Sequence, residues 1–307
     1  MKEYRGVLAA AAAYILWGIL PAYWKLLVEV PVYEILSHRM VWSLFLTLGL
    51  IVFLGQKAAF FREAGERKNL LTFSATSLLL AVNWLLYIWA VNAGYIVEAS
   101  LGYFINPLLN VVFGMIFFRE KMRPLQWAAI CLAVLGVLYL TFFYGKFPWI
   151  ALVLAMTFAV YGLLHKKTSL APLDGLCLET AVFFLPCLVF LLGLEYARGG
   201  AFVHIGTVGS LLLAGAGIIT TVPLLLFGYA AQKIPLSTLG LLQFLAPSIN
   251  LLLGVFIYGE DFSRERMMGF LLIWTGLALF IVENMLRRLR AKRRSLADER
   301  QSQDAGF

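Results

Sequence analysis

The sequence predicts an all-α integral membrane protein with ten transmembrane helices, arranged as two inverted five-helix repeats. Three observations predict this fold: the composition, ten long apolar stretches, and an internal repeat. Of the 307 residues, 62% are hydrophobic and 14% are charged, whereas soluble domains have about 45–50% apolar and about 25% charged residues. A soluble chain of this size leaves about a quarter of its surface in water. The composition therefore excludes a soluble enzyme, a nucleic-acid-binding protein and a disordered chain.

Ten apolar stretches are each long enough to cross a bilayer, which takes about 20 helical residues. Their unbroken apolar runs differ from the alternating pattern of a membrane β-barrel. The first follows Lys2 and Arg5 and resembles a signal peptide, but it is too long for one and precedes no polar domain, so we expect it to be a helix. The ten predicted helices are 6–27, 33–54, 70–93, 97–118, 124–143, 147–165, 174–194, 207–230, 235–258 and 265–286.

The loops between these stretches are short and carry no known cofactor motif. The longest, residues 55–69, is too short for a domain, and nothing in the chain matches a Walker A phosphate loop. Cys131, Cys177 and Cys187 lie in apolar runs without a Cys-x-x-Cys pair or a His cluster. We therefore expect no disulfide, no metal and no cofactor.

The basic residues lie mostly on one side of the predicted topology. With a cytoplasmic N-terminus, nineteen Lys and Arg residues fall in inside segments and four in outside segments. This bias predicts that both termini are cytoplasmic. The four outside residues are Lys146, Arg198, Arg264 and Arg266. The basic cluster 287–294 next to the last helix is typical of lipid contact, so the net charge of +8 does not indicate a nucleic-acid partner.

An internal repeat appears when the sequence is shifted by 140 residues. The shift pairs a Pro, Asn, Gly and Glu series in the same order, and a shift of 144 pairs Trp17-Gly18 with Tyr161-Gly162. Because five helices are an odd number, the second copy enters the membrane from the opposite side, as in many secondary transporters. The predicted domains are 1–143, 144–286 and a basic cytoplasmic tail, 287–307. The pairs are Pro107/Pro247, Asn110/Asn250, Gly114/Gly254, Glu120/Glu260 and Gly136/Gly276.

Several local motifs resemble those of one known family. They are Trp17-Gly18-Ile19-Leu20-Pro21, Tyr23-Trp24-Lys25, His38-Arg39 with Trp42-Ser43, Asn83-Trp84, Tyr87-Ile88-Trp89-Ala90-Val91, and the run from Glu98 to Pro107. Over residues 4–290 the chain resembles the drug/metabolite transporter (DMT) superfamily, EamA family, and within it RarD-type permeases. The resemblance implies two EamA units and a bacterial inner-membrane permease that exports metabolites or drugs. RarD proteins carry a chloramphenicol label, which does not identify a substrate.

Two prolines mark the region that we expect to form a central cavity. Each proline deprives the carbonyl four residues earlier of its donor, and Pro107 and Pro247 do so at Tyr103 and Gln243, which the repeat also pairs. In lipid such carbonyls need protein or a watery cavity. We therefore expect helix breaks at both prolines. The predicted cavity residues are Tyr103, Asn106 and Gln243, with Trp17, Asn83 and Tyr87 as further candidates for contact with an amphipathic solute. For Asn110 and Asn250, a cavity role and an interhelical hydrogen bond remain equal alternatives.

Ionisable residues near helix ends form a second group of candidates. Charges inside a membrane segment usually face a cavity or one another, although snorkelling to the interface explains Lys25 and Glu34. The repeat pairs Arg39 with Glu179, which reverses the sign of the charge. The residues predicted for gating or proton coupling are His38, Arg39, Glu98 and Glu179.

These observations favour a secondary active transporter that exports small organic solutes by alternating access, with protons as a candidate coupling ion. A non-transporting membrane scaffold or regulator is the alternative. An intramembrane enzyme has less support, because the chain has neither a His-Glu-x-x-His nor a Gly-x-Ser-x-Gly motif. The expected partners are a small-molecule substrate and membrane lipid, and a homodimer remains open.

Overall fold

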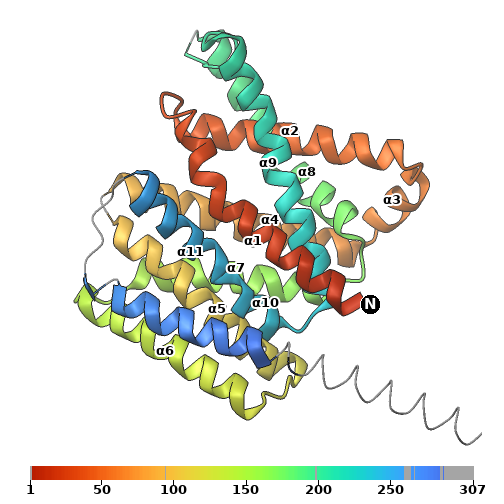
Figure 1. Cartoon of the computed structure of the whole chain (residues 1–307). Coiled ribbons are helices and arrows are strands. Elements are labelled where there is room, and N and C mark those ends of the chain that lie inside the picture. Colours follow the sequence, from red (N-terminus) through yellow and green to blue (C-terminus); the bar gives the residue numbers. More distant parts are fainter. Residues whose placement is uncertain are drawn as a thin grey trace, which may run out of the picture. The chain divides into compact units, whose positions relative to one another are not determined.

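Every regular element in the described part of this computed structural model is a helix. The structure describes residues 2–93, 95–197, 199–258, 264–265, 267–283 and 286. Figure 1 shows the labelled helices along the chain. They are α1 (Lys2–Lys25), α2 (Val32–Phe53), α3 (Lys57–Ala64), α4 (Arg67–Asn92), α5 (Ile96–Phe118), α6 (Pro124–Tyr144), α7 (Trp149–Lys167), α8 (Pro172–Tyr196), α9 (Gly206–Lys233), α10 (Leu236–Gln243), α11 (Leu245–Leu252) and the π-helical turn η1 (Leu253–Ile257).

Within the described residues, nine helical stretches are long and apolar enough to cross a membrane. They match the first nine predicted helices to within a few residues at each end, with α10, α11 and η1 together forming the ninth, Leu236–Ile257. For the tenth, predicted at 265–286, the described part contains a shorter apolar helix, Met267–Glu283. Residues 266, 284 and 285 of that prediction, and the predicted tail 287–307, lie outside the described residues. The all-helical membrane class is thus confirmed.

Two local predictions are wrong. The stretch 55–69, expected to be a loop, contains the two-turn helix α3, whose Phe60 is buried in a small apolar cluster with Ile51. The helix break expected at Pro107 is absent, because α5 continues through this residue. A proline removes only one backbone hydrogen bond, and the rest of the ladder holds the helix on both sides. In the ninth span an interruption does occur, at Phe244, three residues before Pro247.

The chain divides into two compact units. Unit 1 comprises Met1–Arg119 and Phe147–Asp261, and unit 2 comprises Glu120–Lys146 and Phe262–Phe307. Unit 1 therefore contains every labelled helix except α6.

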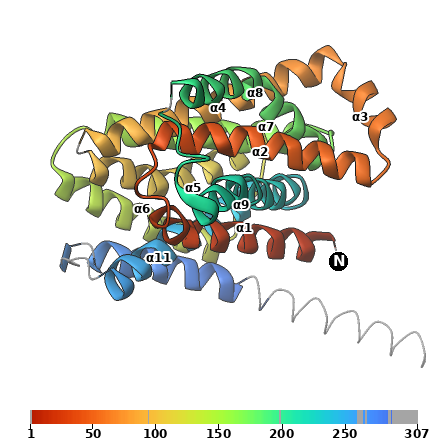
Figure 2. The ribbon, with the colours of Figure 1, turned by 90° about the horizontal axis from the view of Figure 1, so that it is seen from above.

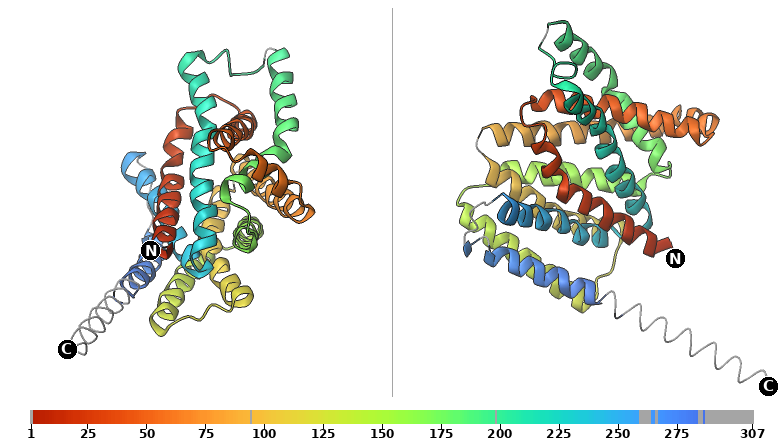
Figure 3. Two further views of the ribbon diagram at one scale, coloured as in Figure 1. Left: turned by 90° about the vertical axis from the view of Figure 1, so that its right-hand side faces the viewer. Right: turned by 45° about the horizontal axis from the view of Figure 1, so that its top comes forward.

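Small residues allow the helices of unit 1 to pack closely. Helix α1 packs against α9 through Ala9, Ala10 and Ala13, which are almost fully buried. Where α2 crosses α9 (Figure 2), a Cβ atom on Gly217 would lie 2.5 Å from the Cβ of Trp42. Helix α8 runs beside α9 in the left view of Figure 3. Membrane helices generally associate through such small-residue contacts, which bring their backbones together.

In unit 2, α6 packs against the helix Met267–Glu283. A Cβ atom on Gly136 would lie 2.8 Å from the carbonyl oxygen of Gly269, and one on Gly276 would lie 2.6 Å from that of Ala129. Arg123 also forms an ion pair with Glu283. The two glycines thus allow these helices to touch along their backbones.

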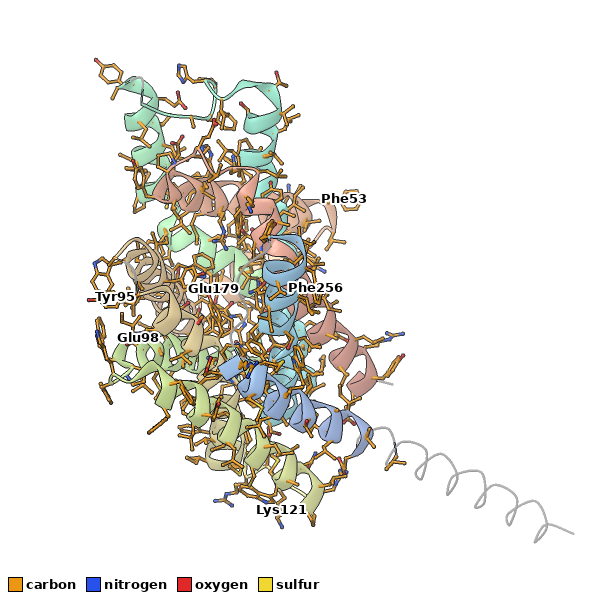
Figure 4. All side chains as sticks on the ribbon, turned by 60° about the vertical axis from the view of Figure 1, so that its left-hand side comes forward. Phe53, Tyr95, Glu98, Lys121, Glu179 and Phe256 are labelled. Carbon is orange, nitrogen blue, oxygen red and sulfur yellow. The ribbon has the colours of Figure 1, made fainter. Side chains whose placement is uncertain are left out.

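Large apolar side chains cover much of the outer surface. Phe53, which points outward in Figure 4, is 86% exposed, and Phe256 is 80% exposed. Soluble proteins rarely expose extended apolar patches. Lipid contact explains this surface.

Candidate functional site

A cavity of about 230 Å³ lies within unit 1. Residues of α1, α2, α4, α5, α7, α9, α10 and α11 form its wall. The structure brings together in this wall all six residues predicted to contact a solute. They are Trp17, Asn83, Tyr87, Tyr103, Asn106 and Gln243.

Three amide side chains are linked at one side of the cavity. The Asn110 Nδ2 group donates to Asn106 Oδ1 at 3.1 Å and to Gln243 Oε1 at 3.0 Å. Asn106 itself donates to the carbonyl oxygen of Ala155 at 2.7 Å. Asn110 is fully buried behind the wall, whereas Asn250 lines the cavity. Asn110 thus fits the interhelical alternative, and it holds Asn106 and Gln243 in place.

The interruption between α10 and α11 positions Gln243. This residue ends α10, and its side chain is 6% exposed. Its oxygen accepts from Asn110, which is the one side-chain hydrogen bond of Gln243 found among the described residues, so its amide nitrogen is not used as a donor there. Gln243 can therefore offer an N–H donor to a solute.

Asn83 on α4 presents an acceptor. Its Nδ2 group donates to the carbonyl oxygen of Leu154 and to Thr157 Oγ1, both at 2.8 Å. An amide nitrogen has two N–H bonds, so both are used. The side-chain oxygen is the group that remains for a solute.

Aromatic rings form the apolar part of the wall. The Trp17 ring centroid lies 5.8 Å from that of Phe158, edge to face, and 5.6 Å from that of Phe227. Tyr87 and Tyr103 pack edge to face at 5.7 Å. Such pairs have defined geometry and hold flat surfaces in place, so the wall suits a solute with an apolar body.

Arg39 on α2 also lines this cavity. Its Nε–H donates to Thr220 Oγ1 at 2.8 Å. The guanidinium carbon lies 4.2 Å from the ring centroid of Trp84 and 5.1 Å from that of Trp24. The structure thus places Arg39 in the cavity wall with the six predicted solute contacts.

Two carboxylates near helix ends, Glu98 and Glu34, accept hydrogen bonds from backbone N–H groups. Glu98 Oε1 accepts a hydrogen bond from the Ile150 N–H at 2.8 Å, in the first turn of α7. A carboxylate at this position accepts a hydrogen bond from a helix N–H that has no partner within the helix, and the positive end of the helix dipole stabilises its negative charge. Glu34 Oε1 accepts from the Ala201 N–H at 2.6 Å. Neither carboxylate belongs to the cavity wall.

His38 lies beside Glu34 and away from the cavity wall. Its Nδ1 accepts from Trp42 Nε1 at 3.3 Å, and its Nε2 lies 3.9 Å from Glu34 Oε1. The imidazole stacks on Phe202 with ring centroids 4.9 Å apart. His38 thus packs from α2 against Phe202, in the segment that precedes α9.

Glu179 on α8 is the centre of a buried polar cluster. Its Oε1 lies 2.8 Å from His165 Nε2, and its Oε2 accepts from the Tyr161 hydroxyl at 3.3 Å. The Ser77 hydroxyl donates to the Glu179 carbonyl oxygen at 2.7 Å. The side chains of His165 and Glu179 are only 3% and 2% exposed. Figure 4 shows Glu179 in the interior, apart from Glu98 at the start of α5.

Within the described residues, no group of three or more His, Cys, Asp or Glu side chains could hold a metal ion. The three cysteines are free; Cys177 is buried and Cys131 is exposed. The expected absence of a cofactor stays a prediction.

Two stretches of the chain, residues 4–142 and 147–282, match the EamA-like transporter family. The chain belongs to this family. "Protein RarD" of Streptomyces exfoliatus is 45% identical over 298 residues, which cover 96% of this chain and 93% of the relative. "Uncharacterized transporter YojE" of Bacillus subtilis (strain 168) is 42% identical over 279 residues, 90% of this chain and 93% of the relative. A solved crystal structure shares the fold with a TM-score of 0.66 at 19% identity, covering 89% of this chain and 96% of its own.

The resemblance to EamA proteins and RarD relatives that the sequence predicted is therefore confirmed. This EamA-family chain is a multi-pass membrane protein of a transporter family. The cavity of unit 1 is therefore the candidate binding site for a solute.

Sequence reasoning missed several residues of the site in this EamA-family chain. Tyr14, Trp24, Trp84 and Phe158 also line the cavity. His165, the direct partner of Glu179, is also absent from the sequence predictions. The aromatic clustering in the first and third predicted helices was the available signal for Trp24 and Trp84. Nothing in the sequence separates Phe158 from the many other phenylalanines.

Proposed function

We propose that this EamA-family chain is a secondary active transporter that exports small organic solutes across the bacterial inner membrane by alternating access. The cavity of unit 1 binds the solute. Its amides orient the polar groups of the solute, and its aromatic rings contact the apolar part.

One observation carries this proposal: polar residues from both halves of the sequence line a single cavity inside apolar helices. Asn83 and Asn106 come from the first half, and Gln243 comes from the second. Polar groups are costly in a membrane interior unless a cavity or partners satisfy them. Residues kept only for packing have no reason to leave Gln243 with a free N–H donor.

The packing of unit 1 supports two inverted repeats of five helices, 1–143 and 144–286. Under the proposed repeat, α1 corresponds to α7, α2 to α8, α4 to α9, and α5 to α10 together with α11. Helix α1 packs on α9, as α7 packs on α4, and α2 packs on α9, as α8 packs on α4. Likewise α1 packs on α10 and α11, and α7 packs on α5. Two similar halves of this kind can exchange conformations and open a shared site to either side.

The bias of basic residues supports cytoplasmic N- and C-termini, with the tail 287–307 at the lipid surface. Reporter fusions after residues 146 and 307 test this topology. An external reporter signal at 146 and an internal one at 307 support it, and the same side for both contradicts it.

We assign proton coupling to the Glu179–His165 pair. His165 Nε2 lies 2.8 Å from Glu179 Oε1, and the two side chains are only 3% and 2% exposed, so the pair can share a proton out of contact with solvent. In the described part of the chain, Tyr161 and Ser77 also form hydrogen bonds with Glu179, and Phe73 packs edge-on against His165. Proton release therefore requires a conformation that admits water, which links it to alternating access.

Reconstitution tests the proposed function. Purified protein in liposomes should move at least one solute from a panel of amino acids, nucleosides, small carboxylates and amphenicol drugs. Asn106→Ala should lower the flux about tenfold or more, because it removes the amide that Asn110 positions. Ile116→Ala is the matched control, since Ile116 lies on the same helix and is 64% exposed. Flux that is absent for every solute, or equal in both variants, contradicts the proposal.

A further inference from the structure

Arg39 is a cation in the cavity wall without an acidic partner in the part of the chain that the structure describes. A guanidinium has five N–H donors, and the structure gives a protein acceptor only to the Nε–H, which donates to Thr220. No described carboxylate lies within 4.0 Å of Arg39, and the cavity wall contains neither Asp nor Glu. The four Nη N–H bonds thus remain for something else.

The surroundings of Arg39 orient its guanidinium but do not neutralise it. Trp84 and Trp24 present their rings to the cation at 4.2 Å and 5.1 Å. Attraction between a cation and an aromatic ring is weaker than the cost of removing a cation from water. Thr220 and the two rings therefore hold the fork in one place and leave its charge available.

The geometry around Arg39 does not favour a role in a gate. A gating ion pair needs an acidic partner, and the residue that the repeat pairs with Arg39 is Glu179. Glu179 already has His165 at 2.8 Å and Tyr161 at 3.3 Å. Arg39 instead shares the cavity with Trp17, a predicted solute contact.

We propose that Arg39 binds a carboxylate of the transported solute, and that the substrates are small organic monoanions with an apolar body. A planar carboxylate accepts two parallel N–H bonds from a guanidinium fork. The apolar body then lies against the aromatic wall, while Asn83 and Gln243 bind any further polar group. The cavity of about 230 Å³ is smaller than the pockets of about 300–1,000 Å³ that hold drug-sized ligands. This inference rests on the proposed transport function and specifies its substrate.

Matched pairs of probes test the charge directly. Purified protein is melted with indole-3-acetate or indole-3-acetamide, and with 3-phenylpropionate or 3-phenylpropionamide. A ligand of the folded state raises the melting temperature with its concentration. Each carboxylate should raise it at concentrations about tenfold or more below those that its amide needs.

Variants locate the effect at Arg39. Arg39→Met should abolish the preference for the carboxylate, and Arg39→Lys should keep part of it, because lysine retains the charge but loses the fork. Arg62→Met is the control, since Arg62 has a side chain 78% exposed on α3. If Arg39→Met does not fold, the comparison of carboxylate with amide in the unchanged protein still tests whether the cavity prefers an anion.

Equal effects of carboxylate and amide, no effect of any carboxylate, or an unchanged preference in Arg39→Met would overturn the proposal. The two proposals fail separately in liposomes. Carboxylate binding without any flux refutes transport and leaves the anion site. Flux of the amides at the rate of the carboxylates refutes the anion site and leaves transport.

Discussion

Gly240→Ala should loosen the contact between α5 and α10 that supports the cavity. A Cβ atom at position 240 would lie 2.6 Å from the Pro107 carbonyl oxygen and 2.7 Å from the Asn110 Cβ. Neither atom can rotate away, because one is backbone and the other is attached to it. Ordinary contact begins near 3.4 Å, so the helices must separate locally by about 0.8 Å.

This separation predicts the size of the effect. Overpacking of this kind costs about 1–3 kcal/mol. A shift of about 0.8 Å also stretches the Asn110–Gln243 hydrogen bond beyond 3.5 Å from its 3.0 Å, which removes a further contribution of about 1 kcal/mol. Alanine returns about 0.5–1 kcal/mol through its higher helix propensity. The net loss of stability is roughly 1–3.5 kcal/mol.

Thermal unfolding in detergent, at one scan rate, measures this loss. At about 2–4 °C per kcal/mol, Gly240→Ala should lower the midpoint by roughly 2–14 °C. Gly49→Ala on α2 is the control, because among the described residues a Cβ atom there would have no neighbour within 4 Å beyond its own stretch of helix, and it should leave the midpoint unchanged or raise it. Equal midpoints for the two variants would refute the close approach of α5 and α10.

Substitutions at three further residues test separate parts of the structure. Glu98→Ala should cost about 1–3 kcal/mol, because it leaves the Ile150 N–H without its acceptor, whereas Glu98→Gln should keep both stability and flux; loss of flux in Glu98→Gln alone would instead give Glu98 a direct role. Glu179→Gln should abolish the response of flux to an imposed pH gradient while solute binding, measured by thermal shift, persists; a retained response contradicts the coupling assignment. Asn110→Leu should raise the KM for the solute several-fold by releasing Gln243, and an unchanged KM contradicts this positioning role.

The transmembrane helices could be predicted from the sequence because each requires an apolar run of about 20 residues. Helix α3 could not, because its two turns are amphipathic and their stability comes from Phe60 packing against Ile51. The uninterrupted course of α5 at Pro107 was also missed, because one lost backbone hydrogen bond does not by itself break a helix whose remaining ladder is intact.

The polar cavity residues could be predicted because Asn83, Asn106 and Gln243 are conspicuous within apolar runs. The proposed role of Arg39 could not be predicted, because its position along α2 does not show whether an acidic side chain or an aromatic ring faces its guanidinium group. The same holds for the Glu179–His165 pair, whose members belong to different helices. Sequence reasoning found the unusual residues and missed their partners.

Accessibility of position 243 from both sides of the membrane tests the central claim most directly. In a chain whose Cys131, Cys177 and Cys187 are replaced by alanine, Gln243→Cys is treated with a membrane-impermeant thiol reagent from either face of sealed vesicles. Alternating access predicts labelling from both faces, slowed by a transported solute. Labelling from neither face, or from one face only and unaffected by solute, would contradict a central cavity that opens to each side in turn.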